Sequence, residues 1–185
     1  MPPDPDWIAD LARYPARPWL KEQSIWALAV YRFGRRLDRR PDGLRRRISE
    51  RIYWLTFRLV ETATGISLPR SARIGPGLRI WHFGNIFVHP DAEIGAGCTL
   101  RQGVTLGNRR EGGPTPVLED GVELGAYAQI LGAVRVGRGA KVGALSVVLA
   151  DVPPGATAVG IPARIVGAAD APAIESGGPC LRSPT

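Results

Sequence analysis

The two histidines of the chain, His82 and His89, are the side chains best suited to proton transfer near neutral pH. His82 lies in the segment WHFGN, where the spacing of apolar residues changes, whereas His89 directly follows the apolar residue Val88. A histidine that takes the proton from a hydroxyl speeds group transfer to that oxygen by on the order of 10²–10⁴-fold. The sequence therefore predicts His82 as a general base. His89 is the alternative base, which we otherwise expect on an outer face as a surface or subunit-contact residue.

Neither histidine belongs to a metal-binding pattern. A catalytic zinc site needs three protein ligands, but the chain has only two histidines, seven positions apart, and no cysteine placed to complete a set. Cys98 stands where the local pattern favours a small residue, so we expect a buried thiol. Cys180 lies in a Gly/Pro/Ser-rich tail, and two cysteines make no disulfide framework. We expect no bound metal.

An aliphatic residue recurs at every sixth position over much of residues 74–148, and this repeat must position the histidines. Six residues suit a short strand and a corner, so three repeats make one triangular coil. Each coil buries its apolar side chains only against neighbouring coils, and four to five coils fit in this length. The aliphatic positions are Ile74, Ile80, Val88, Ile94, Leu100, Leu106, Leu118, Leu124, Ile130, Val136, Val142 and Val148. Small or medium residues follow four positions later, at Ala92, Cys98, Val104, Val122, Ala128, Val134, Ala140, Ser146 and Val152.

The repeat is interrupted twice. Ile80 and Val88 are eight residues apart, so two extra residues must bulge out within residues 81–85, the segment that contains His82. Between Leu106 and Leu118, Gly112 takes the aliphatic position within the charged, Gly/Pro-rich segment GNRREGGPTP. We expect this segment to leave the coils as a loop, and insertions of both kinds are where functional sites are commonly built.

Residues 1–64 follow a helical pattern. Apolar residues at helical spacing predict one helix over residues 19–37 and a second over residues 44–62, separated by the turn at residues 41–43. We therefore expect an N-terminal α-helical segment over residues 1–64, a β domain of six-residue repeats over residues 65–167, and a disordered tail over residues 168–185.

The net charge of +7 lies wholly in residues 1–73, which hold 15 Lys and Arg against 8 Asp and Glu. The basic run RFGRRLDRRPDGLRRR is compatible with a solvated helix face or with peripheral contact to anionic lipid. No aromatic-interleaved motif accompanies it, so we expect no nucleic-acid partner. No apolar run is long enough to cross a bilayer, and the first ten residues lack the features of a signal peptide. We expect a cytoplasmic protein.

Four segments carry a family resemblance that extends over about residues 24–167. They are ALAVYRFGRRL, LPRSARIGPGLRIWHFGNIFV, CTLRQGVTLGN and GAYAQILGAVRVGRGAKVGALSVVLADVPPGATAVGIPARIV. Together they resemble the serine acetyltransferase branch of the hexapeptide-repeat acyltransferases, closest to the subgroup of capsule and exopolysaccharide gene sets. The resemblance implies a left-handed parallel β-helix and direct acetyl transfer from acetyl-CoA to a hydroxyl, with His82 at the position of the catalytic histidine.

The resemblance also implies where coenzyme A binds. In the family it lies in a groove between neighbouring subunits, so we expect a homotrimer. The helical segment is short for the dimer of trimers that longer members form. Small residues let the pantetheine arm approach the main chain, and Lys141 and Arg164 are candidates for its phosphates. The predicted coenzyme-binding residues are Gly107, Asn108, Gly125, Ala126, Lys141 and Ala144.

The acceptor side departs from the family pattern. Ser67 stands where the family has an aspartate that orients the histidine, and Trp81 stands where a second aspartate contacts the amino acid. Pro114 and Thr115 replace an Arg-His pair that also contacts it. Ser67, Trp81 and Thr115 are therefore the predicted acceptor-binding residues, and a flat indole suits a sugar ring. We expect a glycan acceptor of a surface polysaccharide. The alternatives are a true L-serine O-acetyltransferase of cysteine biosynthesis and a non-catalytic, membrane-docked scaffold.

Overall fold

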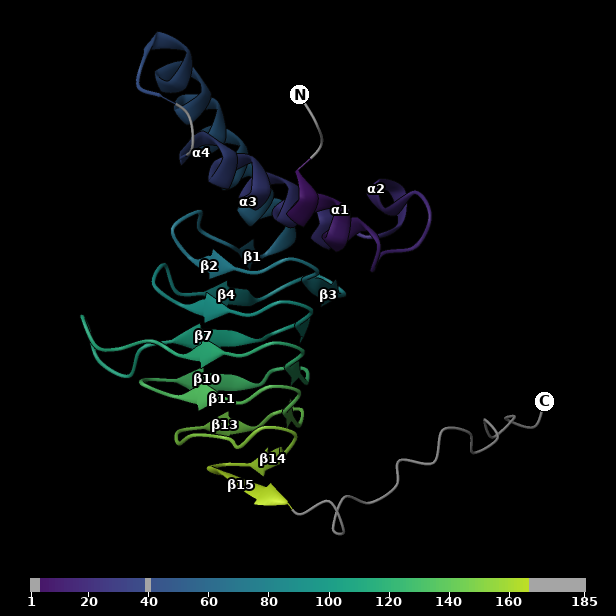
Figure 1. The fold of residues 1–185 in the computed structure, drawn as a ribbon, viewed down its shortest axis with the longest axis vertical. Helices are drawn as coiled ribbons and strands as arrows, with labels where there is room; N and C mark the ends of the chain where they lie inside the picture. Colours follow the sequence, from purple (N-terminus) through teal and green to yellow (C-terminus); the bar gives the residue numbers. More distant parts are fainter. Residues whose placement is uncertain (1–3, 39–40, 167–185) are drawn as a thin grey trace, which may run out of the picture.

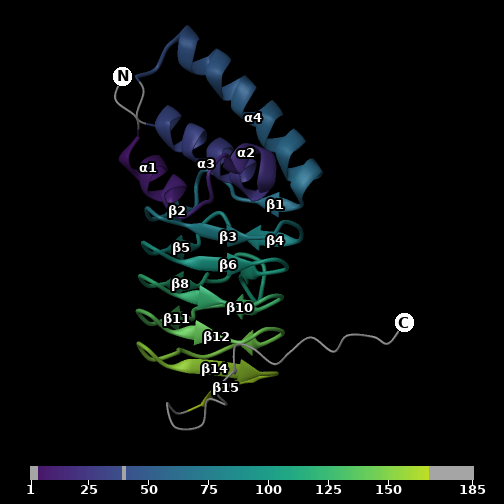
Figure 2. The same ribbon diagram turned by 90° about the vertical axis from the view of Figure 1, so that its right-hand side faces the viewer.

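A computed structural model describes residues 4–38 and 41–166, which form a stack of triangular β coils with helices at one end (Figures 1 and 2). Three sheets make the three sides of the prism, in the orders β1-β4-β7-β10-β13, β2-β5-β8-β11 and β3-β6-β9-β12-β14-β15. All pairings are parallel except the one between β14 and β15, which is antiparallel. The predicted parallel β-helix, of about five coils and preceded by helices, is confirmed.

The strands are short, as a six-residue repeat requires. Their bounds are β1 Ile66–Ser67, β2 Arg73–Ile74, β3 Arg79–Trp81, β4 Ile86–Val88, β5 Glu93–Ile94, β6 Thr99–Arg101, β7 Thr105–Gly107, β8 Val117–Leu118, β9 Glu123–Leu124, β10 Gln129–Leu131, β11 Arg135–Val136, β12 Lys141–Val142, β13 Val147–Val148, β14 Thr157–Gly160 and β15 Ala163–Val166.

The strand register reveals both interruptions of the repeat. Residues of β10 pair with residues of β13 eighteen positions later, which is one regular coil of three repeats. Residues of β3 pair with β6 twenty positions later, and residues of β5 pair with β8 twenty-four positions later. The two extra residues lie within residues 82–85, and the six extra residues lie in the loop before β8, which protrudes from the prism in Figure 1. Both predicted insertions are confirmed.

The predicted repeat positions form the core of the prism. All twelve aliphatic residues are at most 6% exposed, and the small residues four positions later are buried as well, Cys98 among them. Burying an aliphatic side chain contributes roughly 1.5–3 kcal/mol. The stacked coils therefore share one continuous apolar interior.

The helices are α1 Pro5–Leu11, α2 Pro18–Lys21, α3 Ser24–Asp38 and α4 Leu44–Thr64. The prediction of α4 is confirmed. α3 confirms residues 24–37 of the first predicted helix, but the expected start at residue 19 is wrong, because residues 18–21 form the separate helix α2. The helical conformation is interrupted at Glu22, which is extended and forms an ion pair with Arg79 of β3. The apolar spacing continues across this break, so the sequence pattern does not reveal it. α1 was not predicted.

A buried ion pair fastens the helices to the first coil. Arg32 of α3 is 2% exposed and donates to both carboxylate oxygens of Asp10, at 2.7 and 3.0 Å. The same guanidinium donates to the carbonyl oxygens of Ile74 and Gly75, and the Asp10 carboxylate accepts from the backbone of Leu78. This network satisfies both buried charges, which is the condition for such a pair to be tolerated.

Within the described ranges, no helix is both long and apolar enough to cross a membrane. The prediction of a disordered tail over residues 168–185 lies outside the described residues.

Candidate functional site

His82 lies at a corner of the prism, between β3 and β4, where the chain accommodates the two extra residues. Its backbone φ is 66°, in the left-handed region that non-glycine residues adopt rarely. The residue equivalent to Tyr127 and Leu145, whose φ values are 59°, is Asn85 with a φ of 55°, so the positive φ of His82 belongs to the insertion and not to the regular corner. What distinguishes His82 is therefore its place in the insertion, where its side chain is exposed.

A cavity of about 290 Å³ lies beside His82, between this corner and the N-terminal helices. Residues 81–83 form one wall, and residues 21–24, which join α2 to α3, form the other. Trp81 and Phe83 are 43% and 51% exposed, so two aromatic rings flank the histidine. Lys21 and Glu22 bring a positive and a negative charge to the same cavity. The cavity can therefore receive a small molecule that carries both polar and apolar groups.

A stack of rings around Arg79 supports the Trp81 wall. The guanidinium carbon of Arg79 lies 4.1 Å from the Tyr14 ring centroid and 4.2 Å from that of Trp81. Glu22 accepts from both terminal nitrogens of Arg79, at 2.5 and 2.7 Å. Burial disfavours the charge of Arg79, but the hydrogen bonds and the charge of Glu22 outweigh it, so the pKa of Arg79 is raised. Burial also raises the pKa of Tyr14.

The imidazole of His82 forms no hydrogen bond with the part of the chain that the structure describes. Ser67, which stands at the position of the family's orienting aspartate, is half-buried in β1 and pairs through its backbone with β4. His89 is occupied elsewhere, because its Nδ1 accepts from the backbone nitrogen of Asp91 at 3.2 Å. Of the two histidines, His82 alone lines the cavity.

The predicted coenzyme-binding residues fall on two different edges of the prism. Ala126 and Ala144 lie at the corners that follow β9 and β12, on the same edge as His82, which we call the His82 edge. The corners stack directly, because Leu145 donates its backbone N–H to the carbonyl of Ala126 at 2.8 Å. Gly125 and Lys141 lie beside them. The Nζ atom of Lys141 is 3.8 Å from the Oε1 atom of Glu123.

Gly107 and Asn108 lie at the other edge of the same face, where β7 ends and the loop of residues 108–116 begins; we call it the loop edge. Thr115 is on this edge too, and its hydroxyl donates to the carbonyl of Asp91 at 3.0 Å. Arg164 is exposed in β15, at the far end of the prism. One chain therefore does not bring all the predicted site residues together.

Sequence reasoning missed the residues that position the loop and the cavity. Arg109 donates to the carbonyl oxygens of Leu131 and Leu149, which fastens the loop along its edge above a cavity of about 340 Å³. Phe83 could have been found from its position next to His82. Glu22 and Arg79 could not, because they are far apart in sequence and no local pattern joins them.

Among the described residues, no group of three or more His, Cys, Asp or Glu side chains is arranged to hold a metal ion.

No family model matches the chain, but individual proteins do. A serine acetyltransferase from Helicobacter pylori is 38% identical over 147 residues, which cover 77% of this chain and 80% of that protein. One from Escherichia coli K12 is 46% identical over 107 residues, 57% of this chain and 39% of that protein. The chain thus spans about two fifths of the length of the first curated relatives that it matches.

Solved structures agree with the sequence comparisons. Soybean serine acetyltransferase in complex with serine superposes with a TM-score of 0.75 at 33% identity, covering 88% of this chain and 70% of that one. A serine acetyltransferase in complex with CoA gives a TM-score of 0.70 at 34% identity, covering 87% and 66%. None of these relatives is described as a capsule or exopolysaccharide protein. Because the Helicobacter pylori enzyme is 38% identical and is matched over 80% of its length, the chain belongs to the serine acetyltransferase family of hexapeptide-repeat β-helix acyltransferases.

Proposed function

We propose that the protein is an acetyl-CoA-dependent O-acetyltransferase in which His82 acts as general base. The observation that carries the proposal is the exposed imidazole of His82 on the inserted corner, beside a cavity of acceptor size. A hydroxyl oxygen attacks the thioester carbonyl carbon while the imidazole takes the hydroxyl proton. The tetrahedral intermediate then expels the coenzyme A sulfur, which receives that proton from the imidazolium. The acetyl group passes directly to the acceptor without a covalent enzyme intermediate.

We propose a homotrimer, with acetyl-CoA bound between the His82 edge of one copy and the loop edge of the next. The division of the predicted residues supports it: Ala126 and Ala144 share an edge with His82, whereas Gly107 and Asn108 lie across the face. The CoA-bound relative supports acetyl-CoA as the donor. The free imidazole would gain its orienting partner when acceptor and donor bind, since catalytic hydrogen bonds often tighten only in the complex.

L-serine is the acceptor that we propose first. Solved relatives include complexes with serine. The cavity also contains Lys21, whose positive charge suits the carboxylate group of an amino acid. Lys21 lies outside the positions that match the family motif, so the departures from that motif do not exclude serine. A glycosyl hydroxyl is the second candidate, favoured by the exposed rings of Trp81 and Phe83.

Release of coenzyme A from acetyl-CoA, measured with L-serine and with a panel of neutral sugars, tests the proposal. We expect turnover with L-serine and a 10²–10⁴-fold loss of kcat in H82A, the range typical of a general base. The matched control is H89A, which removes the other histidine and should keep nearly full activity. Turnover with sugars alone would replace serine by the second candidate. No turnover with either acceptor class, or equal losses in the two variants, would refute catalysis by His82.

A further inference from the structure

The outward face of α4 carries a stripe of aliphatic side chains that the described part of the chain leaves uncovered. The stripe consists of Leu44, Ile48, Ile52, Leu55 and Leu59, each at least 49% exposed. Steps of three and four residues place all five on one side of the helix. The opposite side carries Tyr53 and Phe57, which are buried in a small cluster with residues of α3. Packing within the described chain thus accounts for one side of α4 only.

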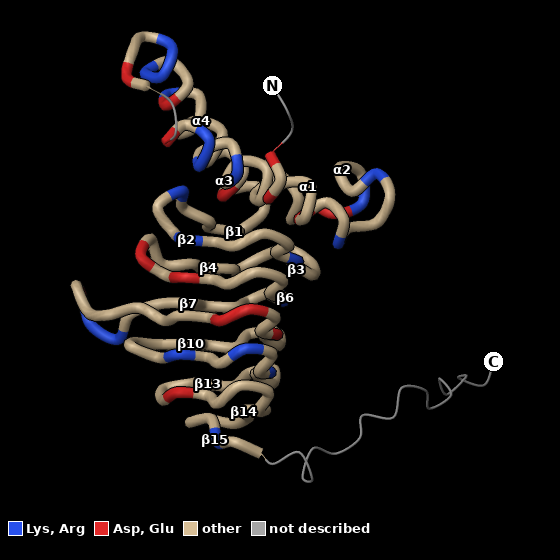
Figure 3. Tube along the Cα trace, viewed as in Figure 1, with Lys and Arg blue, Asp and Glu red and all other residues tan. Residues whose placement is uncertain are grey.

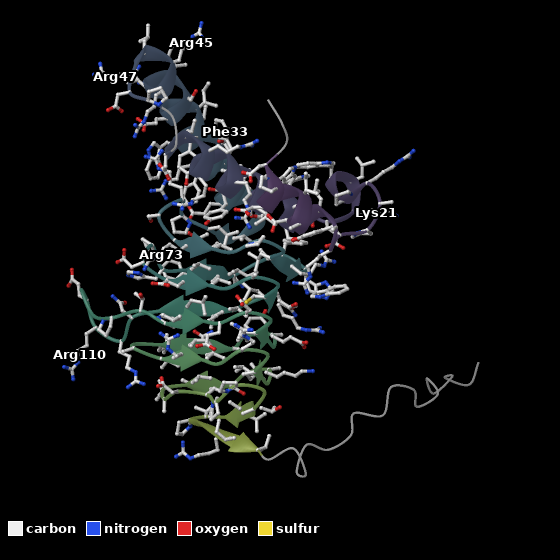
Figure 4. All side chains as sticks on the ribbon, in the orientation of Figure 1. Lys21, Phe33, Arg45, Arg47, Arg73 and Arg110 are labelled. Carbon is white, nitrogen blue, oxygen red and sulfur yellow. The ribbon has the colours of Figure 1, made fainter. Side chains whose placement is uncertain are left out.

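Arginines accompany this stripe. The exposed charged residues of α4 are Arg45, Arg47, Arg51 and Arg58. The two glutamates of the helix are half-buried and lie in ion pairs, Glu50 with Arg46 and Glu61 with Arg58. Arg45 and Arg47 extend outward from the free end of α4 in Figure 4, whereas the β coils display both signs of charge in Figure 3. The exposed face of α4 is therefore apolar and positively charged.

The charge of this face distinguishes between the partners that could cover it. In a two-fold contact with a second copy, the same surface would serve both partners, so arginines would meet arginines with no exposed carboxylate of α4 to offset them. A nucleic acid would satisfy the arginines but leave the aliphatic stripe in water. A bilayer with anionic headgroups matches both features, because the stripe enters the headgroup–acyl boundary while the arginines contact the phosphates.

We propose that α4 docks the protein on the surface of an anionic lipid bilayer. The 21 residues of α4 make a helix about 31 Å long. Its two faces differ strongly, and none of the described helices is apolar enough to cross a membrane, so α4 lies in the plane of the interface. The proposal is independent of acetyl transfer, because no residue of α4 lines the His82 cavity.

Flotation of the full-length protein with vesicles tests this docking. One set of vesicles contains phosphatidylcholine and phosphatidylglycerol in equal amounts, and the other contains phosphatidylcholine alone. We expect the protein to float with the first set only, and to be released as salt screens the charges. The triple variant R47Q/R51Q/R58Q should lower the partition coefficient on the order of 100-fold, since each arginine near a charged surface contributes about 1 kcal/mol. The double variant I52S/L55S should also abolish flotation.

The matched control is R110Q/R135Q/R138Q, which removes three exposed arginines from the β domain and should float like the wild type. All substituted positions are exposed, and circular dichroism verifies folding. Absence of the wild type from the anionic vesicles would overturn the proposal. So would an equal loss in the control. If I52S/L55S changed the oligomeric state in size-exclusion chromatography while flotation persisted, a second copy would be the occupant and the proposal would be wrong.

Discussion

Arg79 lies between the rings of Tyr14 and Trp81 and is held there by Glu22, 57 residues earlier in the chain. This relationship ties the wall of the His82 cavity to the N-terminal helices. Trp81 is 43% exposed, so one part of its ring rests on the guanidinium while the rest faces solvent. The wall of the His82 cavity is therefore formed jointly by a β corner and the segment between two helices.

The variant R79L should weaken acceptor binding through loss of this support. A cation–π contact contributes about 0.5–2 kcal/mol, so we expect KM for the acceptor to rise roughly 3- to 30-fold while kcat changes little. The more conservative variant E22Q should also raise KM for the acceptor, but by a smaller factor. Steady-state kinetics with saturating acetyl-CoA measure both. R138L, on an exposed arginine of the β coils, is the control. A fall in kcat at constant KM would contradict a positioning role for Arg79.

The ion pair of Arg32 with Asp10 should determine whether the helices stay docked on the first coil. Removing one partner of a buried pair leaves an uncompensated charge and costs about 3–5 kcal/mol. We expect D10A to lose this much free energy of unfolding in urea. The comparison variant R58A breaks an exposed pair on α4, with Arg58 74% exposed, and should cost less than about 1 kcal/mol. Similar losses in the two variants would show that Asp10 contributes no more than a surface charge.

The repeat predicts much of the fold because its six-residue period directly determines the length of each side of the coil. Every predicted aliphatic position is buried, and the spacing anomalies around His82 and Gly112 coincide with the insertions. The helix break at Glu22 is different, because what stabilises it is a long-range ion pair with Arg79 rather than a local signal. For the same reason the sequence does not place Lys21 and Glu22 beside His82.

The predicted site residues show the same division. Assignment of Ala126 and Ala144 to the edge that carries His82 follows from coil periodicity. The position of the loop of residues 108–116 does not follow from this periodicity. It depends on Arg109, which donates to carbonyl groups of two later coils.

Two predicted coenzyme-binding glycines should respond differently to alanine. A Cβ at Gly125 would lie 2.5 Å from the backbone nitrogen of Ala144, whereas one at Gly107 would meet its nearest atom at 3.6 Å, an ordinary contact. We expect G125A to lose roughly 1–3 kcal/mol of stability through overpacking. G107A should fold normally and raise KM for acetyl-CoA if the pantetheine arm passes over this backbone. Thermal melts and donor kinetics separate the two effects. Normal donor kinetics in G107A would remove Gly107 from the coenzyme site.

Cys98 is buried in the prism, and burial raises the pKa of its thiol from the ordinary 9.0 to about 11. A shift of about two pH units lowers the thiolate fraction about 100-fold near neutral pH. In the variant C180S, which leaves Cys98 as the only thiol, iodoacetamide should therefore react at least 100-fold more slowly with the native protein than with the urea-unfolded chain. Mass spectrometry of quenched samples measures this rate. Comparable rates in the native and unfolded protein would contradict the burial of Cys98.

The same shift makes stability depend on alkaline pH. Below pH 9 the thiol of Cys98 is protonated in both the native and unfolded states, so its contribution is constant. Between pH 9 and about 11 the unfolded chain releases the proton while the native protein retains it, and unfolding becomes more favourable by at most about 2–3 kcal/mol. Burial raises the pKa of Tyr14, Tyr31 and Tyr53 too, which adds a loss of the same sign. C98A should remove only the cysteine part, so its melting temperature should fall less steeply than that of the wild type over this range. Parallel slopes would mean that the thiol titrates alike in both states.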